Sequence, residues 1–101
     1  MDQDKIRHLA SRSSILMRAL SNEYRVAILC QLTEGEKSVT ELIDLIGLNP
    51  SPLSQHLALL RRTGLVQSRR QSQTMHYSLK DAHATKIIDF LFTLYCDDDS
   101  K

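Results

Sequence analysis

The stretch PSPLSQHLALLRRTGLVQSRRQSQTMHYSL at residues 50–79 decides how this chain folds. It opens on two prolines, which the first turn of a helix tolerates because its N–H groups have no helical partner. The helix is expected to end near Thr63 and Gly64. Two segments of alternating polarity follow, residues 65–70 and 74–79, as in half-buried strands. This order predicts a recognition helix and a β-wing, the DNA-contacting half of a winged helix-turn-helix.

Helical periodicity extends through most of the remaining sequence. The segments concerned are residues 4–20, 22–35, 39–47 and 82–96. The chain therefore reads α-α-α-α-β-β-α, a mainly α fold with a small β-wing, in one domain spanning residues 1–101.

Local signals predict where several helices begin. Ser38 and Glu41 have the spacing of a capping box. The side chains of Asn22, Asn49 and Asp81 are placed to cap the second, fourth and last helices.

Apolar residues at helical spacing predict a core that is thin at this length. Its expected members on the second to fourth helices are Ala27, Ile28, Leu32, Leu42, Leu45, Ile46, Leu53, Leu57 and Leu60. The last helix has an apolar face too broad for one small domain to cover, formed by Ile87, Ile88, Leu91, Leu94 and Tyr95. We therefore expect a two-fold homodimer through the terminal helices, residues 4–20 and 81–96.

The net charge of +1 hides an uneven distribution along the chain. Residues 1–44 hold seven acidic and six basic side chains, and residues 81–101 hold five aspartates and two lysines. Residues 45–80 contain no acidic side chain, and their cations are Arg61, Arg62, Arg69, Arg70 and Lys80. The positive field therefore coincides with the predicted helix and wing, where it would attract phosphates. A basic face that is only solvated is the alternative.

The polar side of the fourth helix suits the major groove of DNA. Small side chains let the helix approach the bases, and arginines reach phosphates. The residues on this side are Ser51, Ser54, Gln55, Ala58, Arg61 and Arg62. Gln55 can pair with an adenine edge, and Ser54 can contact a base or a phosphate. His56 is included among the expected DNA contacts, although it can instead pack against the domain or serve only a phosphate.

The wing is expected to contact the DNA backbone or the neighbouring minor groove through Arg69, Arg70 and Gln71. An arginine pair on an edge strand can also serve only to prevent aggregation, but the acid-free surroundings favour DNA. The wing tip at residues 71–73 has no glycine, which argues for a loop longer than two residues.

Other classes of protein fit the sequence less well. No apolar run approaches the ~18 residues of a membrane span, and the N-terminus lacks the apolar segment of a secretory signal. We expect a cytoplasmic protein without membrane contact. No glycine-rich phosphate loop or catalytic triad is visible, so neither enzyme activity nor a cofactor is expected. The tail, residues 97–101, is expected to be disordered.

The order of elements, with LSQHLALLRRTGLV at its centre, resembles the ArsR/SmtB family of bacterial transcriptional repressors. The segments SVTELIDLIGLNPSPLSQHLALLRRTGLV and TMHYSL carry the resemblance, which covers nearly the whole chain, while Pro50 and Pro52 depart from it. The resemblance implies a homodimer on a two-fold symmetric, double-stranded DNA operator. Repression is the action it implies by default, and an anti-silencing action that raises expression is the alternative.

The metal sites of that family are incomplete in this sequence. The arsenic and cadmium type needs Cys-x-Cys on the third helix, where this chain has VTELIDLIG. The zinc type needs two ligands further along the last helix from Asp81 and His83, but those positions hold Leu94 and Asp97. No metal site is therefore expected. A regulator that senses metal or has no inducer stays an alternative, as does a protein-interaction module.

The two cysteines indicate a different inducer. Cys30 in ILC and Cys96 in LYC resemble the HlyU, BigR and SqrR branch of the family, whose dithiol regulators respond to reactive sulfur species and oxidants. The resemblance implies that a disulfide or polysulfide bridge between Cys30 and Cys96 switches operator binding. Both lie near helix C-termini, where the dipole disfavours a thiolate, so reactivity would depend on proximity and access. Two core cysteines without a sensing role are the alternative.

Overall fold

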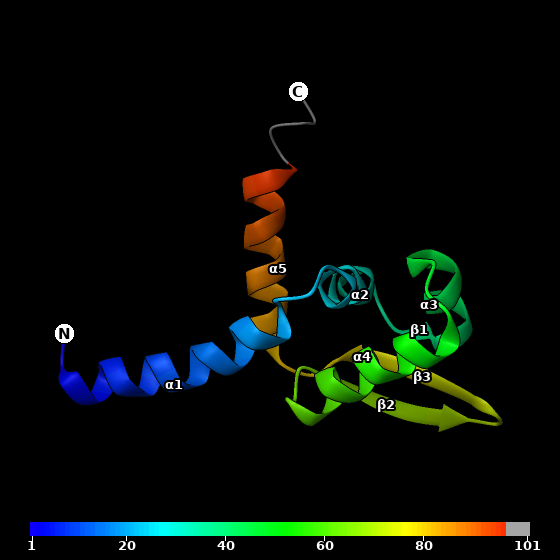
Figure 1. Ribbon diagram of the computed structural model, residues 1–101, viewed down its shortest axis with the longest axis horizontal. Coiled ribbons are helices and arrows are strands. Elements are labelled where there is room, and N and C mark those ends of the chain that lie inside the picture. Colours follow the sequence, from blue (N-terminus) through cyan, green and yellow to red (C-terminus); the bar gives the residue numbers. More distant parts are fainter. Residues whose placement is uncertain (97–101) are drawn as a thin grey trace.

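Over residues 1–96, which the structure describes, the computed structural model contains five helices and three strands (Figure 1). In chain order they are α1 (Gln3–Ala19), α2 (Glu23–Thr33), β1 (Lys37–Ser38), α3 (Val39–Ile46), α4 (Pro50–Arg62), β2 (Val66–Gln71), β3 (Thr74–Leu79) and α5 (Ala82–Tyr95). The predicted order of helices and wing strands is confirmed, and β1 is an addition. The tail for which disorder is expected, residues 97–101, lies outside the described residues.

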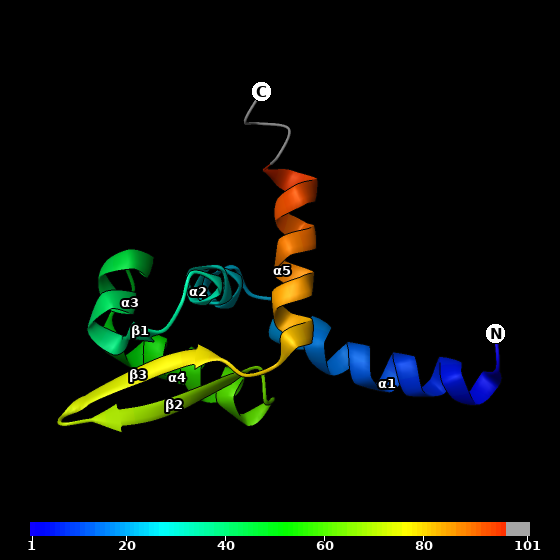
Figure 2. The ribbon, with the colours of Figure 1, turned by 180° about the vertical axis from the view of Figure 1, so that it is seen from behind.

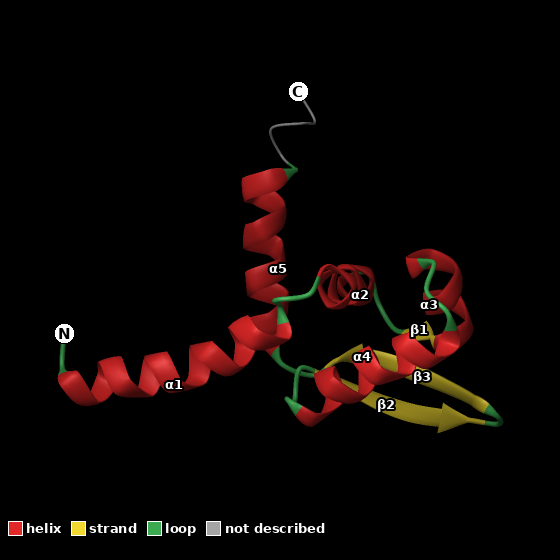
Figure 3. Cartoon of the chain, in the orientation of Figure 1, coloured by secondary structure: helices red, strands yellow, loops and turns green. Residues whose placement is uncertain are grey.

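The core joins all five helices to the base of the wing. Its buried members are Ala19, Ile28, Leu29, Leu32, Leu42, Leu53, Leu57, Leu60, Leu65, Val66, Ala84 and Ile88. The prediction that Leu45 belongs to the core was wrong, because this residue is 50% exposed. Helix α3 lies at the end of the body away from α1 (Figure 3) and buries only Leu42 fully.

The predicted caps are confirmed with one exception. Asn22 accepts hydrogen bonds from the backbone N–H groups of Tyr24 and Arg25, and Ser38 and Glu41 form the capping box of α3. Asn49 stands at the N-cap of α4 but makes no side-chain capping bond. An asparagine cap binds the second or third N–H of its helix. The third residue here is Pro52, which has none, so only the N–H of Ser51 is left for it.

The wing is a three-stranded antiparallel sheet with the order β1-β3-β2. The prediction of a longer loop at the wing tip was wrong, since Gln71 pairs with Thr74 and leaves a two-residue turn. Ser72 adopts a φ of 57° there, the left-handed conformation that usually selects glycine or asparagine. In the view from behind, β2 and β3 extend past α3 as a long ribbon (Figure 2).

The two terminal helices project from the body in different directions (Figure 1). Ile88 of α5 is buried, and Ile87 and Leu91 are partly buried, because α5 packs on α2 and β3 of its own subunit. Large apolar side chains along α1 and on the outer half of α5 stay exposed: Ile6, Leu9, Ile15, Met17, Phe90, Phe92, Leu94 and Tyr95. No helix among the described residues is long and apolar enough to cross a membrane.

Candidate nucleic-acid interface and thiol pair

Helix α4 is amphipathic, with one apolar side and one polar side. Leu53, Leu57 and Leu60 are buried in the core. On the opposite side the predicted residues Ser51, Ser54, Gln55, Arg61 and Arg62 are exposed, and Ala58 is partly exposed. The structure thus brings the expected DNA-contacting residues of this helix together on one accessible face, with both arginines at its C-terminal end.

Two predicted contacts of α4 are engaged with the rest of the domain. Arg61 donates from Nη1 to Oγ of Ser68 on β2 at 3.2 Å, and the second is His56. Its ring stacks on Tyr24 of α2, with the centroids 6.0 Å apart and an interplanar angle of 28°. Its Nδ1 atom lies 3.3 Å from Nη1 of Arg25. Burial, and secondarily the nearby Arg25 charge, lower the pKa of His56, so the ring is neutral at physiological pH.

Arg25 is a residue that the sequence reasoning missed, because it lies outside the acid-free segment. Its Nε donates to the carbonyl oxygen of Ala19 at 2.8 Å, and its Nη2 donates to the carbonyl oxygen of Arg18 at 3.2 Å. Arg25 therefore connects the end of α1 to α2 and, through His56, to α4.

A crevice opens where α2 meets the exposed side of α4. It has a volume of about 400 Å³ and is lined by Arg25, Gln55, His56, Ala58, Leu59 and Arg62. Two arginines and no acidic side chain line it, so its walls favour an anion.

The wing presents its predicted residues unequally. Arg69 forms a bidentate ion pair with Glu36, with Nε–Oε2 and Nη2–Oε1 distances of 2.8 and 2.7 Å. Hydrogen bonding from Arg69 lowers the pKa of Glu36, and the same bond raises the pKa of Arg69. Arg69 also donates to Gln71 Oε1 at 3.0 Å. The Arg70 side chain is exposed and makes no side-chain hydrogen bond or ion pair within the described part of the chain.

The two cysteines lie on neighbouring helices. Cys30 is half-buried on α2, Cys96 is exposed at the C-cap of α5, and both are free thiols. The two helices pack against each other. Burial, and secondarily the charge of Cys96, raise the pKa of Cys30.

Asp81 and His83, the two zinc-type positions that the sequence keeps, are explained by their local contacts. Asp81 Oδ1 accepts a hydrogen bond from the backbone N–H of His83 at 2.8 Å and lies 3.0 Å from its Nδ1. Asp81 is thus the cap of α5. Within residues 1–96 no group of three or more His, Cys, Asp or Glu side chains is placed to hold a metal ion.

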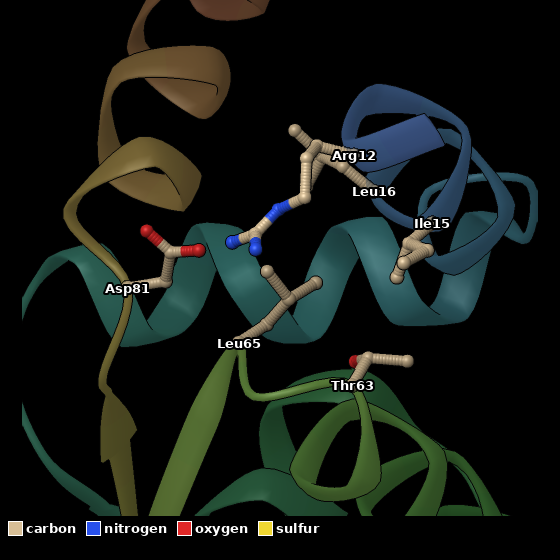
Figure 4. Close-up of a pocket in the computed structure, with 6 residues that line it drawn as sticks. All are labelled: Arg12, Ile15, Leu16, Thr63, Leu65 and Asp81. Carbon is tan, nitrogen blue, oxygen red and sulfur yellow. The ribbon is translucent and has the colours of Figure 1, made fainter. Parts of the chain in front are cut away.

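A second hollow, about 240 Å³ in volume, lies between α1, the end of α4 and the start of α5 (Figure 4). It is lined by Arg12, Ile15, Leu16, Thr63, Leu65 and Asp81. Figure 4 shows the Arg12 guanidinium directed toward the Asp81 carboxylate. One cation and one carboxylate line this hollow, so its walls carry no net charge that would favour phosphate.

The sequence is similar to a family of bacterial regulatory proteins and to individual transcriptional regulators. Residues 22–68 match the family model described as bacterial regulatory protein, arsR family. The transcriptional activator HlyU of Vibrio cholerae is 41% identical over 96 residues, covering 95% of this chain and 89% of that protein. The biofilm growth-associated repressor of Xylella fastidiosa is 35% identical, with coverages of 95% and 84%.

Solved structures agree with this fold. Reduced HlyU from V. cholerae superposes with a TM-score of 0.88 at 41% identity, covering 92% of this chain and 98% of the other. BigR from X. fastidiosa gives a TM-score of 0.88 at 35% identity, with coverages of 95% and 98%. A homodimeric winged helix-turn-helix domain from Mycobacterium bovis gives 0.78 at 25% identity, with coverages of 92% and 86%.

Proposed function

Because the chain belongs to the ArsR family of bacterial regulatory proteins, and is therefore a DNA-binding transcriptional regulator, we propose that reactive sulfur species or oxidants switch its operator binding through Cys30 and Cys96. The observation that carries the proposal is the placement of two free thiols on α2 and at the end of α5, two helices that pack against each other. One of these helices also carries Arg25, which contacts the recognition helix.

The protein binds a two-fold symmetric operator as a homodimer. Large apolar side chains are exposed along α1 and on the outer half of α5, and a second copy would cover them. Two copies of α4 then enter successive major grooves, about 34 Å apart. The homodimeric relative from M. bovis supports this arrangement.

Each recognition helix reads the operator through the exposed side of α4. Gln55 and Ser54 contact base edges, and Ser51, Arg61 and Arg62 contact the sugar-phosphate backbone. Arg70 and Gln71 extend the contact along the wing, and Arg69 contributes from within its ion pair. His56 contributes from the crevice between α2 and α4.

The switching chemistry needs a donor of sulfane sulfur, such as a low-molecular-weight persulfide. The thiolate of one cysteine attacks the outer sulfur of the donor, forms a protein persulfide and releases the donor thiol. The second cysteine then attacks the inner sulfur of that persulfide, which forms the Cys30–Cys96 disulfide and releases H₂S. The cysteines lose two electrons, which the sulfane sulfur gains. Where both cysteines are persulfidated, loss of one H₂S leaves a trisulfide.

A bridge would act on DNA binding by fixing α5 against α2. Helix α5 carries the proposed subunit interface, and α2 packs on α4. Because a bond between the two cysteines requires Cα atoms within about 7 Å, its formation limits how α5 and α2 can move. A small change in the spacing of the two α4 helices leaves one half-site poorly fitted, and the dimer releases the operator.

The proposal is tested by treating the reduced dimer with a persulfide donor and following intact mass and operator affinity together. The wild type should lose affinity as the bridged mass appears, and a thiol reductant should restore it. Cys30→Ser and Cys96→Ser should bind the operator in the reduced state and not respond. An unchanged affinity in fully bridged wild type, or an equal response in both variants, would reject the switch.

A further inference from the structure

We propose that Arg25 is a positioning residue for DNA recognition, which holds His56 so that the ring presents its Nε2–H to the DNA. The inference rests on the proposed function in one respect, namely that the exposed side of α4 contacts the operator. It adds a residue of α2 to the recognition machinery and assigns the hydrogen-bonding role of His56.

The tautomer of His56 follows from the chemistry of its neighbour. A guanidinium has five N–H donors and no acceptor. Because Nη1 of Arg25 lies 3.3 Å from Nδ1 of His56, a neutral imidazole can accept this bond only through an unprotonated Nδ1. The ring hydrogen is then on Nε2, and the outer nitrogen of His56 is a donor.

The Nε2 atom is available to a ligand. No residue in the described part of the chain hydrogen-bonds to it, and no buried side-chain nitrogen or oxygen there lacks a partner. An unpartnered Nε2 on this partly buried ring must therefore be open to solvent. The residue itself lines the crevice that Gln55 and Arg62 also line.

Arg25 is itself held in place. Its Nε and Nη2 atoms donate to the carbonyl oxygens of Ala19 and Arg18 at the C-terminal end of α1, where the helix dipole favours a cation. Stacking on Tyr24 limits the remaining freedom of the His56 ring. The Arg25 guanidinium thus fixes the His56 ring relative to the C-terminal end of α1. Helix α1 is one of the two helices assigned to the subunit interface.

The ligand of Nε2–H is a hydrogen-bond acceptor on DNA. Purine N7, guanine O6, thymine O4 and phosphate oxygens all meet this description. A base-edge acceptor and a phosphate acceptor can be distinguished by whether the effect of changing His56 depends on the DNA sequence. A base-edge contact should be lost only on the operator when His56 is changed, and a phosphate contact should be lost equally on unrelated DNA.

The tautomer can be measured without DNA. In the free wild-type dimer, ¹H–¹⁵N correlation of the labelled imidazole rings should show His56 as the Nε2–H tautomer. Arg25→Ala should give a mixture of tautomers, and Arg25→Lys an intermediate spectrum. An unchanged Nε2–H signal in Arg25→Ala would overturn the proposal, whether or not the wild type binds its operator.

Two substitutions of His56 separate its nitrogens. His56→Gln places an amide nitrogen near the position of Nε2, whereas His56→Asn places one near Nδ1. His56→Gln should keep most of the operator affinity, and His56→Asn should lose about 3- to 10-fold, the effect of one neutral hydrogen bond. Equal losses in the two variants would contradict the assigned donor.

A double-mutant cycle tests whether Arg25 acts through His56. Arg25→Ala combined with His56→Ala should weaken binding no further than His56→Ala alone. Fully additive losses would refute the positioning role. Thermal unfolding of each variant shows whether it is folded, and if Arg25→Ala does not fold, Arg25→Lys takes its place in the cycle.

Discussion

Glu36 and Arg69 are bound to each other by two short hydrogen bonds, 33 residues apart in the sequence. The acidic partner comes from the link between α2 and β1, outside the acid-free segment. One of the wing's two arginines is therefore compensated by a carboxylate, and the other is not. The electrostatic contribution of the wing to DNA binding should be correspondingly uneven.

Glu36→Gln is expected to strengthen binding to all DNA sequences. Removing the carboxylate leaves the Arg69 charge uncompensated, and the dependence of log K on log salt should steepen by about 0.9, the effect of one additional phosphate contact. Titrations at several salt concentrations measure both quantities. Glu34→Gln is a matched control, because Glu34 is exposed and has no ion pair within the described residues. An unchanged slope in Glu36→Gln would contradict the prediction.

Arg70→Ala should weaken binding to all sequences and reduce the salt slope by about 0.9. Arg69→Ala combined with Glu36→Gln should have a smaller effect on both, since this double variant removes two charges that already compensate each other. Competition between operator and unrelated DNA shows whether the loss is uniform. The expectation fails if the double variant Arg69→Ala, Glu36→Gln costs as much affinity as Arg70→Ala.

Gln55→Ala should relax the preference for one base pair in each half-site. The amide is exposed on α4 and can pair with both edge atoms of an adenine, a contact that discriminates by about 1–3 kcal/mol. Binding to operators with every substitution at each position identifies the pair. A uniform loss over all operators would assign Gln55 to the phosphate backbone instead.

Cys30 is expected to react with electrophiles faster as the pH rises. Burial and the Cys96 charge hold the pKa of Cys30 above its ordinary value of 9.0. Little Cys30 thiolate is therefore present at neutral pH, and the thiolate fraction still increases as the pH rises past 9.0. Alkylation rates of Cys30 followed by mass spectrometry give the profile. In Cys96→Ser the profile should move to lower pH, since one of the two causes is removed. Identical profiles in the two proteins would argue against proximity of the sulfurs.

Phe92→Glu should convert the proposed homodimer to a monomer and abolish tight operator binding. The side chain is 56% exposed within the subunit, so the fold should tolerate the charge, whereas a buried interface should not. Light scattering gives the mass in solution. Thr40→Glu is the control, because Thr40 is exposed on α3, far from the terminal helices in Figure 1. A dimeric Phe92→Glu would place the interface elsewhere.

The sequence predicts those parts of the fold that short spacings determine. Ser38 and Glu41 are three positions apart and form the expected capping box. Leu53, Leu57 and Leu60 follow helical spacing and are buried. The pattern around Leu45 has the same form, but burial there depends on whether another element covers α3, which no local spacing encodes.

The features that the sequence does not predict depend on contacts between distant segments. Strand β1 has two residues and exists only because Lys37 and Ser38 pair with β3. Arg25 and His56 are 31 positions apart, and no motif marks the arginine. The turn at Ser72 was missed for a different reason, since a left-handed serine is uncommon and the absence of glycine is only a statistical signal.

The uncovered aromatic rings of α5 have a consequence for the newly synthesised chain. In the proposed homodimer, each subunit exposes Phe90, Phe92 and Tyr95 until it meets another copy, and such a surface attracts chaperones and proteases. A cell that makes this protein slowly would therefore keep less of it than the rate of translation alone implies. The abundance of the regulator should rise more steeply than its messenger RNA, because pairing becomes faster than degradation.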